Sequence, residues 1–214
     1  MSTGEGGGYA VGRRRRERIL EIATRRFAES GYSSVSMAAI ARDAGLTTPG
    51  LLHHFPTKQH LLLAVADHRF DLASGLASSA PHGDDGLGAL RTMLLITRQF
   101  VSQPGLIELF VALSAEAADP STAAHELFRA RYERVTGELV ARFEEGVATG
   151  RLRPDLDYAA VARECIALAD GLQLQFVLSA RRLDLVAGIR THLERLAREI
   201  VATPGEIRLD VDDV

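Results

Sequence analysis

The stretch "SMAAIARDAGLTTPGLLHHF", residues 36–55, has the pattern of two short helices joined by a tight turn. Ser36 and Thr47 each precede a helical segment, and hydroxyl residues of this kind cap helix N-termini. Gly45 lies between the segments and can adopt the left-handed backbone conformation that such a turn requires. These proportions are typical of a helix-turn-helix.

Residue types inside this stretch suit contact with a nucleic acid. The helix that begins at Thr47 presents free N–H groups and a partial positive charge, which suit a phosphate. Pro49 occupies the first turn, where its missing N–H does no harm. Gly50 has no side chain, so the backbone can approach a groove closely, while Ala41 lets the two helices cross closely. Apolar residues are placed to pack the pair against the preceding helix: Ile40, Leu46, Leu51 and Phe55.

The rest of the chain shows helical periodicity and almost no alternation of β-branched residues, so we predict an all-α protein of about nine helices. The expected helices span 14–30, 37–44, 47–54, 57–79, 87–102, 105–118, 121–149, 158–180 and 184–202. Glycines, prolines and a loop at 78–86 separate them.

The charge of the chain is distributed unevenly. The 214 residues carry a net charge of −3, but residues 1–60 hold nine Lys or Arg against five Asp or Glu, a net +4. The remainder therefore carries −7. A basic first quarter on an acidic remainder predicts that the N-terminal part meets a polyanion.

Composition excludes several classes of protein. Cys165 is the single cysteine, which rules out an intramolecular disulfide and an all-cysteine zinc site. No apolar run approaches the roughly 20 residues of a membrane span, and the segment after the arginines is no signal-peptide core. We therefore expect a cytoplasmic protein without membrane contact, and we predict no cofactor.

The segment "RERILEIATRRFAESGYSSVSMAAIARDAGLTTPGLLHHFPTK", residues 16–58, resembles the DNA-binding domain of the TetR family of transcriptional regulators. Its features occur in the family's order: Ala-x-x-x-Phe-x-x-x-Gly-Tyr, then Ile-Ala-x-x-Ala-Gly, then His-Phe-Pro-x-Lys. The stretch "DGLQLQFVL", residues 170–178, also looks like the dimer-helix region of many members.

The resemblance implies a set of DNA contacts by position. Ser36 and Lys58 would touch phosphates. The other implied contacts, in the major groove or near the backbone and base edges, are Thr47, Thr48, Pro49, Gly50, His53 and His54. Three positions depart from the family pattern, which often has Tyr at Leu52, Thr or Ser at Gly50, and Gly or a polar residue at Pro49. Fewer side chains then remain for direct base readout, and contact with thymine methyl groups gains weight.

The basic run Arg13, Arg14, Arg15 and Arg16 has two readings: a solvated charge run, or an arm that orders on DNA. Four cations at a helix N-terminus oppose the helix dipole, which favours an arm in the neighbouring minor groove. His53 and His54 do not form a metal site in our reading, because adjacent helical residues point about 100° apart. We predict no metal site.

The resemblance implies a second, helical part of the chain that binds a ligand and forms a dimer. We predict a disordered tail at 1–12, a helix-turn-helix domain at 13–56, an effector-binding and dimerisation domain at 57–203, and a loose acidic tail at 204–214.

The last two helices are apolar on more than one face, which favours a two-fold dimer through a four-helix bundle. A large single-chain core is the alternative. The predicted interface residues are Val161, Cys165, Leu168, Leu172, Phe176, Leu185, Ile189, Leu193 and Leu196.

Large apolar residues of the middle helices, with a few polar ones, are candidates to line an effector pocket, although each alone is more often a core residue. The predicted lining is Met93, Ile96, Gln99, Phe100, Leu109, Phe110, Leu113, His125, Phe128, Tyr132 and Gln173.

The sequence thus predicts a regulator that binds a palindromic DNA operator as a homodimer and is released by a small, largely apolar effector. One alternative is a helix-turn-helix protein without an effector, controlled by a partner or acting as an architectural factor. A helical enzyme is the other, but "HELFR" (125–129) has Arg where a zinc protease needs its second His. We expect no enzymatic activity and no catalytic residues.

Overall fold

A computed structural model describes residues 5–79, 86–203, 205, 207 and 209 of the chain. Nine α-helices make up these described parts, which agrees with the all-α prediction. In chain order they are α1 (Glu5–Ser30), α2 (Met37–Asp43), α3 (Thr48–His54), α4 (Lys58–Ser79), α5 (Gly88–Val101), α6 (Pro104–Glu116), α7 (Ala123–Ala148), α8 (Tyr158–Leu178) and α9 (Leu185–Ile200).

Capping residues set the helix ends where the sequence predicts them. The Ser36 hydroxyl accepts a hydrogen bond from Ala39 N at 3.2 Å, and the Thr47 hydroxyl accepts one from Gly50 N at the same distance. Gly45 has a φ of +67°, so the turn between α2 and α3 uses the left-handed conformation that glycine tolerates. Each of these local predictions is confirmed.

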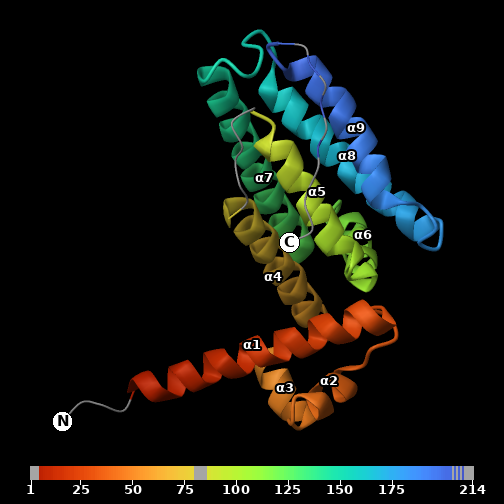
Figure 1. The fold of residues 1–214 in the computed structure, drawn as a ribbon. Helices are drawn as coiled ribbons and strands as arrows, with labels where there is room; N and C mark the ends of the chain where they lie inside the picture. Colours follow the sequence, from red (N-terminus) through yellow and green to blue (C-terminus); the bar gives the residue numbers. More distant parts are fainter. Residues whose placement is uncertain (1–4, 80–85, 204, 206, 208, 210–214) are drawn as a thin grey trace.

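The first three helices form a compact head at one end of the molecule (Figure 1). Ile40, Leu51 and Phe55 are buried against Phe27 and its neighbours on α1, as predicted. A salt bridge of 2.5 Å from Arg26 Nη2 to Asp43 Oδ2 also joins α1 to α2. Because the three helices bury these apolar side chains together, α3 is held in a fixed position relative to α1.

The two ends of the chain differ from the prediction. We predicted a disordered tail over 1–12, but α1 begins at Glu5; of the predicted tail, residues 1–4 lie outside the described residues. A helix once nucleated gains one backbone hydrogen bond per added residue, so it continues through glycines of low helix propensity. Most of the predicted loose tail at 204–214 lies outside the described residues, but Leu209 is fully buried in the core of the helical bundle.

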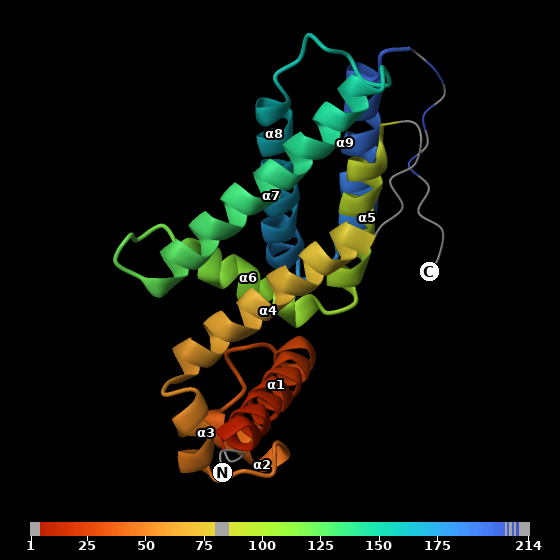
Figure 2. The ribbon, with the colours of Figure 1, turned by 90° about the vertical axis from the view of Figure 1, so that its left-hand side faces the viewer.

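Helices α4 to α9 form a bundle beside the head, and α4 runs from the head along it (Figures 1 and 2). The short helix α6 lies where head and bundle meet (Figure 2). A Cβ added at Gly105, in the first turn of α6, would lie 2.0 Å from the carbonyl oxygen of Phe27 on α1. Only glycine therefore lets α6 sit directly on the α1 backbone.

Polar contacts hold the rest of α6 in place. Gln59 at the start of α4 donates to the Glu116 carboxylate at 2.7 Å and 2.8 Å. Arg181, in the loop between α8 and α9, donates to Glu108 at 2.6 Å. Helix α6 thus contacts the head, the connecting helix α4 and the α8–α9 loop.

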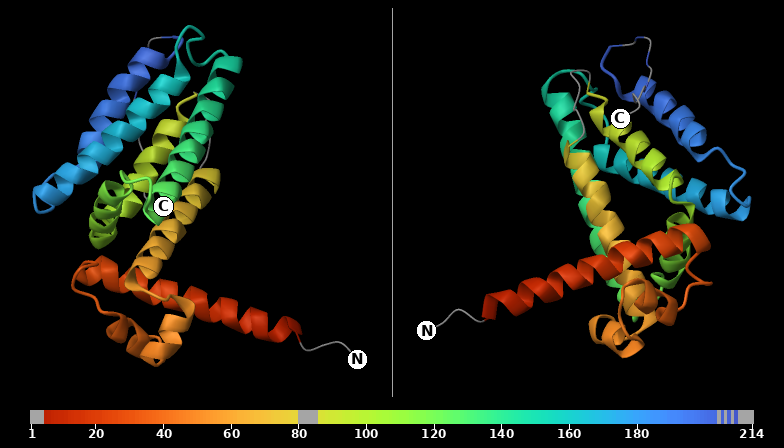
Figure 3. Two further views of the ribbon diagram at one scale, coloured as in Figure 1. Left: turned by 180° about the vertical axis from the view of Figure 1, so that it is seen from behind. Right: turned by 60° about the horizontal axis from the view of Figure 1, so that its bottom comes forward.

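Helices α8 and α9 lie side by side along one flank of the bundle (Figure 3). Six of the nine predicted interface residues are buried within their own chain, in the core that includes α5, α7, α8 and α9: Cys165, Phe176, Leu185, Ile189, Leu193 and Leu196. We correct their assignment, because their burial places them in the core of their own chain, which leaves little of them to form a dimer interface.

Three members of the predicted interface, Val161, Leu168 and Leu172, are half-buried. Leu174 and Leu178 on α8 are exposed. No helix in the described parts of the chain is long and apolar enough to cross a membrane.

The contact between α6 and α1 predicts the effect of adding one methyl group. Gly105→Ala should destabilise the protein by about 1–3 kcal/mol, because its Cβ would overlap backbone atoms that cannot move alone. Gly137→Ala is the matched control: a Cβ there meets nothing within 4 Å, and alanine favours the helix by up to roughly 1 kcal/mol. Urea unfolding at a fixed protein concentration measures both variants. Equal stability of the two would contradict this packing.

Candidate DNA-binding surface and ligand pocket

The N-terminal end of α3 is the part of the head that could enter a groove of DNA. Thr47, Thr48 and Pro49 are exposed, while Leu51 on the opposite face is buried. Gly50 is half-buried, and a Cβ there would lie 3.2 Å from the Thr47 hydroxyl oxygen. The structure therefore brings Thr47, Thr48, Pro49 and Gly50 to the N-terminal end of α3, whereas the predicted contacts His53 and His54 lie in its last turn.

The two predicted phosphate contacts lie at the starts of two other helices, α2 and α4. Ser36 is exposed at the N-terminus of α2. Lys58 is half-buried and donates from Nζ to the backbone oxygen of Ser33 at 3.4 Å, which holds its ammonium near the α1–α2 loop. Their role towards DNA stays a prediction.

The arginine run lies inside α1 and not at a helix N-terminus, so the argument for an arm that opposes the helix dipole was wrong. Arg13 forms an ion pair with Glu17 at 3.8 Å. Arg16 stacks at 5.0 Å from the centre of the Phe55 ring, and Arg14 and Arg15 line a hollow with Gly45 at the turn. The four cations therefore belong to the head surface beside the helix-turn-helix.

The adjacent histidines have different surroundings. His53 is exposed, whereas His54 is half-buried, and their rings meet edge to face with centres 5.6 Å apart. Burial lowers the pKa of His54, and the neighbouring His53, Arg15 and Arg16 lower it further. No group of three or more His, Cys, Asp or Glu within reach of one metal ion occurs among the described residues.

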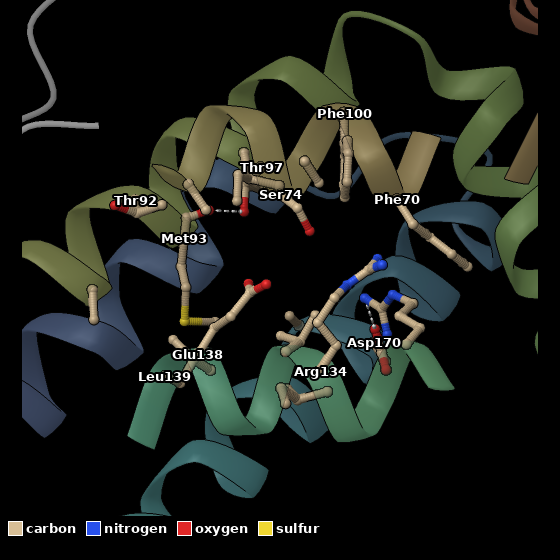
Figure 4. Close-up of a pocket in the computed structure, with 18 of the residues that line it drawn as sticks. Phe70, Ser74, Thr92, Met93, Thr97, Phe100, Arg134, Glu138, Leu139 and Asp170 are labelled. Atoms are coloured by element: carbon tan, nitrogen blue, oxygen red, sulfur yellow. Dashed lines mark hydrogen bonds and ion pairs between the residues drawn. The ribbon is translucent and has the colours of Figure 1, made fainter. Parts of the chain in front are cut away.

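A cavity of about 110 Å³ lies between α4, α5, α7 and α8 (Figure 4). Four residues of the predicted lining reach it: Met93, Ile96, Phe100 and Gln173. The others do not line it. Leu109, Phe110, Leu113 and Phe128 are packed in the core shared with the head.

The polar members of the predicted lining also lie elsewhere. His125 bonds through Nδ1 to the Ala117 backbone oxygen at 2.9 Å and holds the α6–α7 loop, and Gln99 is exposed. Tyr132 donates its hydroxyl proton to Asp170 Oδ2 at 2.6 Å. None of these three residues lines the cavity.

We did not predict from the sequence that charged residues line the cavity. Arg131, Arg134, Glu138 and Arg142 come from α7, and Asp170 comes from α8. Their spacing could have indicated a common face: charged residues at 131, 134, 138 and 142 follow one another every three or four residues and therefore lie on one face of a helix. A search for apolar residues alone overlooks such a face.

Two arginines lie at the cavity: Arg69 is buried and packs on a wall residue, and Arg131 is half-buried and lines the cavity. Arg69 of α4 donates to the Leu106 backbone oxygen and stacks 3.7 Å from the centre of the Phe100 ring. Burial lowers the pKa of Arg69 to about 9, with Arg131 as a second cause. Arg131 lies 3.9 Å from Asp170, and burial raises the pKa of that carboxyl group despite the nearby arginine.

Comparison with known proteins identifies the family. The family profile "Bacterial regulatory proteins, tetR family" matches residues 19–65, and the profile "BetI-type transcriptional repressor, C-terminal" matches residues 89–201, more than half of the chain. The chain belongs to the TetR family of transcriptional regulators. It is therefore a DNA-binding regulator with a helix-turn-helix, in a family of regulators and not of enzymes.

Relatives of this TetR-family chain match over most of its length. The transcriptional regulator BetI of Agrobacterium fabrum is 29% identical over 179 residues, covering 81% of this chain and 82% of its own. A putative transcriptional regulator of Saccharomonospora viridis, solved in complex with choline, is 26% identical with a TM-score of 0.68, covering 87% and 97%. A TetR regulator of Haloarcula marismortui, at 22% identity and a TM-score of 0.75, covers 87% and 98% and shares the fold.

The hydroxyl that caps α3 allows a test of what stabilises the DNA-binding head. Thr47→Ala should destabilise the protein by about 1 kcal/mol, because it removes the hydroxyl that accepts from Gly50 N. Thr47→Ser keeps an equivalent oxygen and should lie close to the wild type. Urea unfolding compares the three proteins. If serine proves as damaging as alanine, the hydroxyl is not what stabilises this end.

Proposed function

We propose that this regulator binds a palindromic operator as a dimer and that a small, largely apolar molecule in the bundle cavity releases it. The exposed N-terminal end of α3, backed by a buried face, is the observation that supports operator binding. Two such ends about 34–36 Å apart would meet successive major grooves on one side of the duplex. The linkage then follows, because a ligand that favours another head spacing weakens DNA binding reciprocally.

Contacts of the connecting helix support this mechanism. Phe70 of α4 lines the cavity, and Lys58 begins the same helix at the edge of the head. A ligand that moves α4 therefore acts on a helix that also ends at the proposed DNA surface. A partner-controlled regulator without an effector would leave the cavity without a role.

The Saccharomonospora viridis relative suggests a first ligand class. That protein was solved with choline. A quaternary ammonium ligand is therefore the class to compare first with the chemistry of this cavity.

Operator binding is tested by selecting sites from random duplex DNA and measuring affinity by fluorescence anisotropy at several salt concentrations. Lys58→Ala should weaken binding to selected and scrambled DNA alike, and should reduce the salt slope by about one, because one phosphate is no longer neutralised. Arg129→Ala is the control, since Arg129 is exposed on α7 and pairs with Glu126 and Glu133. Failure to enrich any sequence would refute operator binding.

The proposed dimer predicts an asymmetry between two exposed leucines. Leu178 at the end of α8 is 75% exposed, and Leu72 on α4 is 55% exposed. Leu178→Glu should raise the dimer dissociation constant at least about tenfold, because a charge would be buried in the contact. Leu72→Glu should leave it unchanged. Sedimentation equilibrium measures both, and a wild-type protein that sediments as one 23.2 kDa chain would exclude the dimer.

A further inference from the structure

We propose that the effector is an organic monoanion: a compact apolar body that carries one carboxylate. The proposal rests on the proposed function, because it names the chemical class of the ligand that the cavity would take. It is carried by the arginines around the cavity, by their unpartnered N–H groups, and by aromatic faces that these arginines already occupy.

Positive charge exceeds negative charge in the cavity wall. Arg131, Arg134 and Arg142 line it, against Glu138 and Asp170. The Asp170 carboxylate is already engaged, since it accepts from the Tyr132 hydroxyl and faces Arg131. Arg131 and Asp170 thus largely offset each other. The wall then leaves Arg134, which lies 3.9 Å from Asp71 outside the lining, and Arg142 against the carboxylate of Glu138.

Buried hydrogen-bonding groups near the cavity lack partners. The Arg131 side chain is 13% exposed and its Nη1 has no partner, and Nη2 of Arg69 has none either. Gln173 is 5% exposed, and its amide oxygen is unpaired. Buried groups left in this state are costly, and a carboxylate in the cavity would satisfy Arg131, which lines it.

Gln173 can serve the same ligand. Its amide nitrogen makes only long contacts, at 3.4 Å to the Ala169 backbone oxygen and 3.4 Å to Asp170 Oδ1. Because both contacts are long, the side chain can rotate away from them and donate its N–H groups to a carboxylate, whereas a flip of the amide alone would set its oxygen against two acceptors.

The same contacts disfavour a cationic ligand. A quaternary ammonium group binds aromatic faces and spare carboxylates. Here the Arg69 guanidinium covers Phe100 at 3.7 Å, and Arg131 lies 5.0 Å from the ring centres of Phe70, Phe110 and Tyr132. The protein's own cations thus already lie over Phe70 and Phe100, the aromatic residues that line the cavity.

The two ends of the cavity differ in charge, so we expect the ligand to carry one negative charge and not two. Arg134 and Asp170 lie at the end near Phe70, whereas Glu138 extends into the cavity beside Met93 at the other end (Figure 4). A carboxylate at the Arg134 end directs the apolar body towards Met93. A second carboxylate would meet Glu138 and be repelled.

The volume limits the size of the apolar body. Ligand pockets usually span roughly 300–1,000 Å³, and an engineered cavity of about 150 Å³ holds benzene. A cavity of about 110 Å³ therefore fits one ring or a short chain. Benzoate and hexanoate are suitable test compounds.

The experiment compares matched compounds on the full chain without DNA, by isothermal titration calorimetry. The sets are benzoate, benzamide and benzylamine, then hexanoate, hexanamide and hexylamine, with terephthalate, adipate and choline added. We expect at least one monoanion to bind at least tenfold more tightly than its amide, its amine and its dianion. The proposal is overturned if no monoanion binds, or if an amide, an amine or choline binds as tightly.

Variants locate the carboxylate. Arg134→Gln, at a side chain 40% exposed, and Arg131→Gln should each raise the dissociation constant of the best monoanion at least tenfold. Arg129→Gln, on the same helix but away from the cavity, should leave it unchanged. Thermal melts check that each variant folds. If Arg131→Gln does not fold, the affinity of Arg134→Gln alone tests the assignment. Unchanged affinity of Arg134→Gln would overturn the assignment.

Failure of the proposed function gives a different result. A monoanion that binds but does not alter operator affinity contradicts ligand-controlled release and leaves the ligand class intact. Release of the operator by choline or an amine, with no response to monoanions, contradicts the ligand class and leaves ligand-controlled release intact.

Discussion

The direct packing of α6 on the α1 backbone at Gly105 is the constraint on which the arrangement of head and bundle depends. The carbonyl oxygens of Phe27 and Ala28 occupy the space that any side chain would need. Apolar side chains on flexible stems would allow the two helices to slide, whereas backbone contact leaves little freedom. The head is therefore held by the same short helix that contacts α4 and the α8–α9 loop.

This position of α6 connects the cavity with the head through few contacts. Arg69 bonds to the backbone oxygen of Leu106, next to Gly105, and stacks on Phe100 in the cavity wall. A ligand that displaces Phe100 or Phe70 must therefore also disturb the seat of α6 on α1. Packed helices of this kind favour discrete arrangements over gradual deformation, which suits a switch between two head positions. The chain of contacts is the physical basis of the coupling that we propose.

Local chemistry explains how much of the fold could be predicted. Caps at Ser36 and Thr47 act within three residues, so the sequence itself locates those helix starts. The fold of the head could be predicted equally well, because its motif spans only 16–58. The lining of the cavity could not be predicted, because periodicity marks an apolar face without identifying the helix that covers it. Phe110 and Cys165 thus proved to be core residues, and the arginine face of α7 was overlooked because charged faces usually meet solvent.

Hydrogen–deuterium exchange of the free and the operator-bound protein tests the coupling most directly. The account predicts that DNA binding slows amide exchange in α6, over 104–116, as well as in the head, because the two share one rigid contact. Slowed exchange confined to α1, α2 and α3, with α6 unchanged, would contradict it.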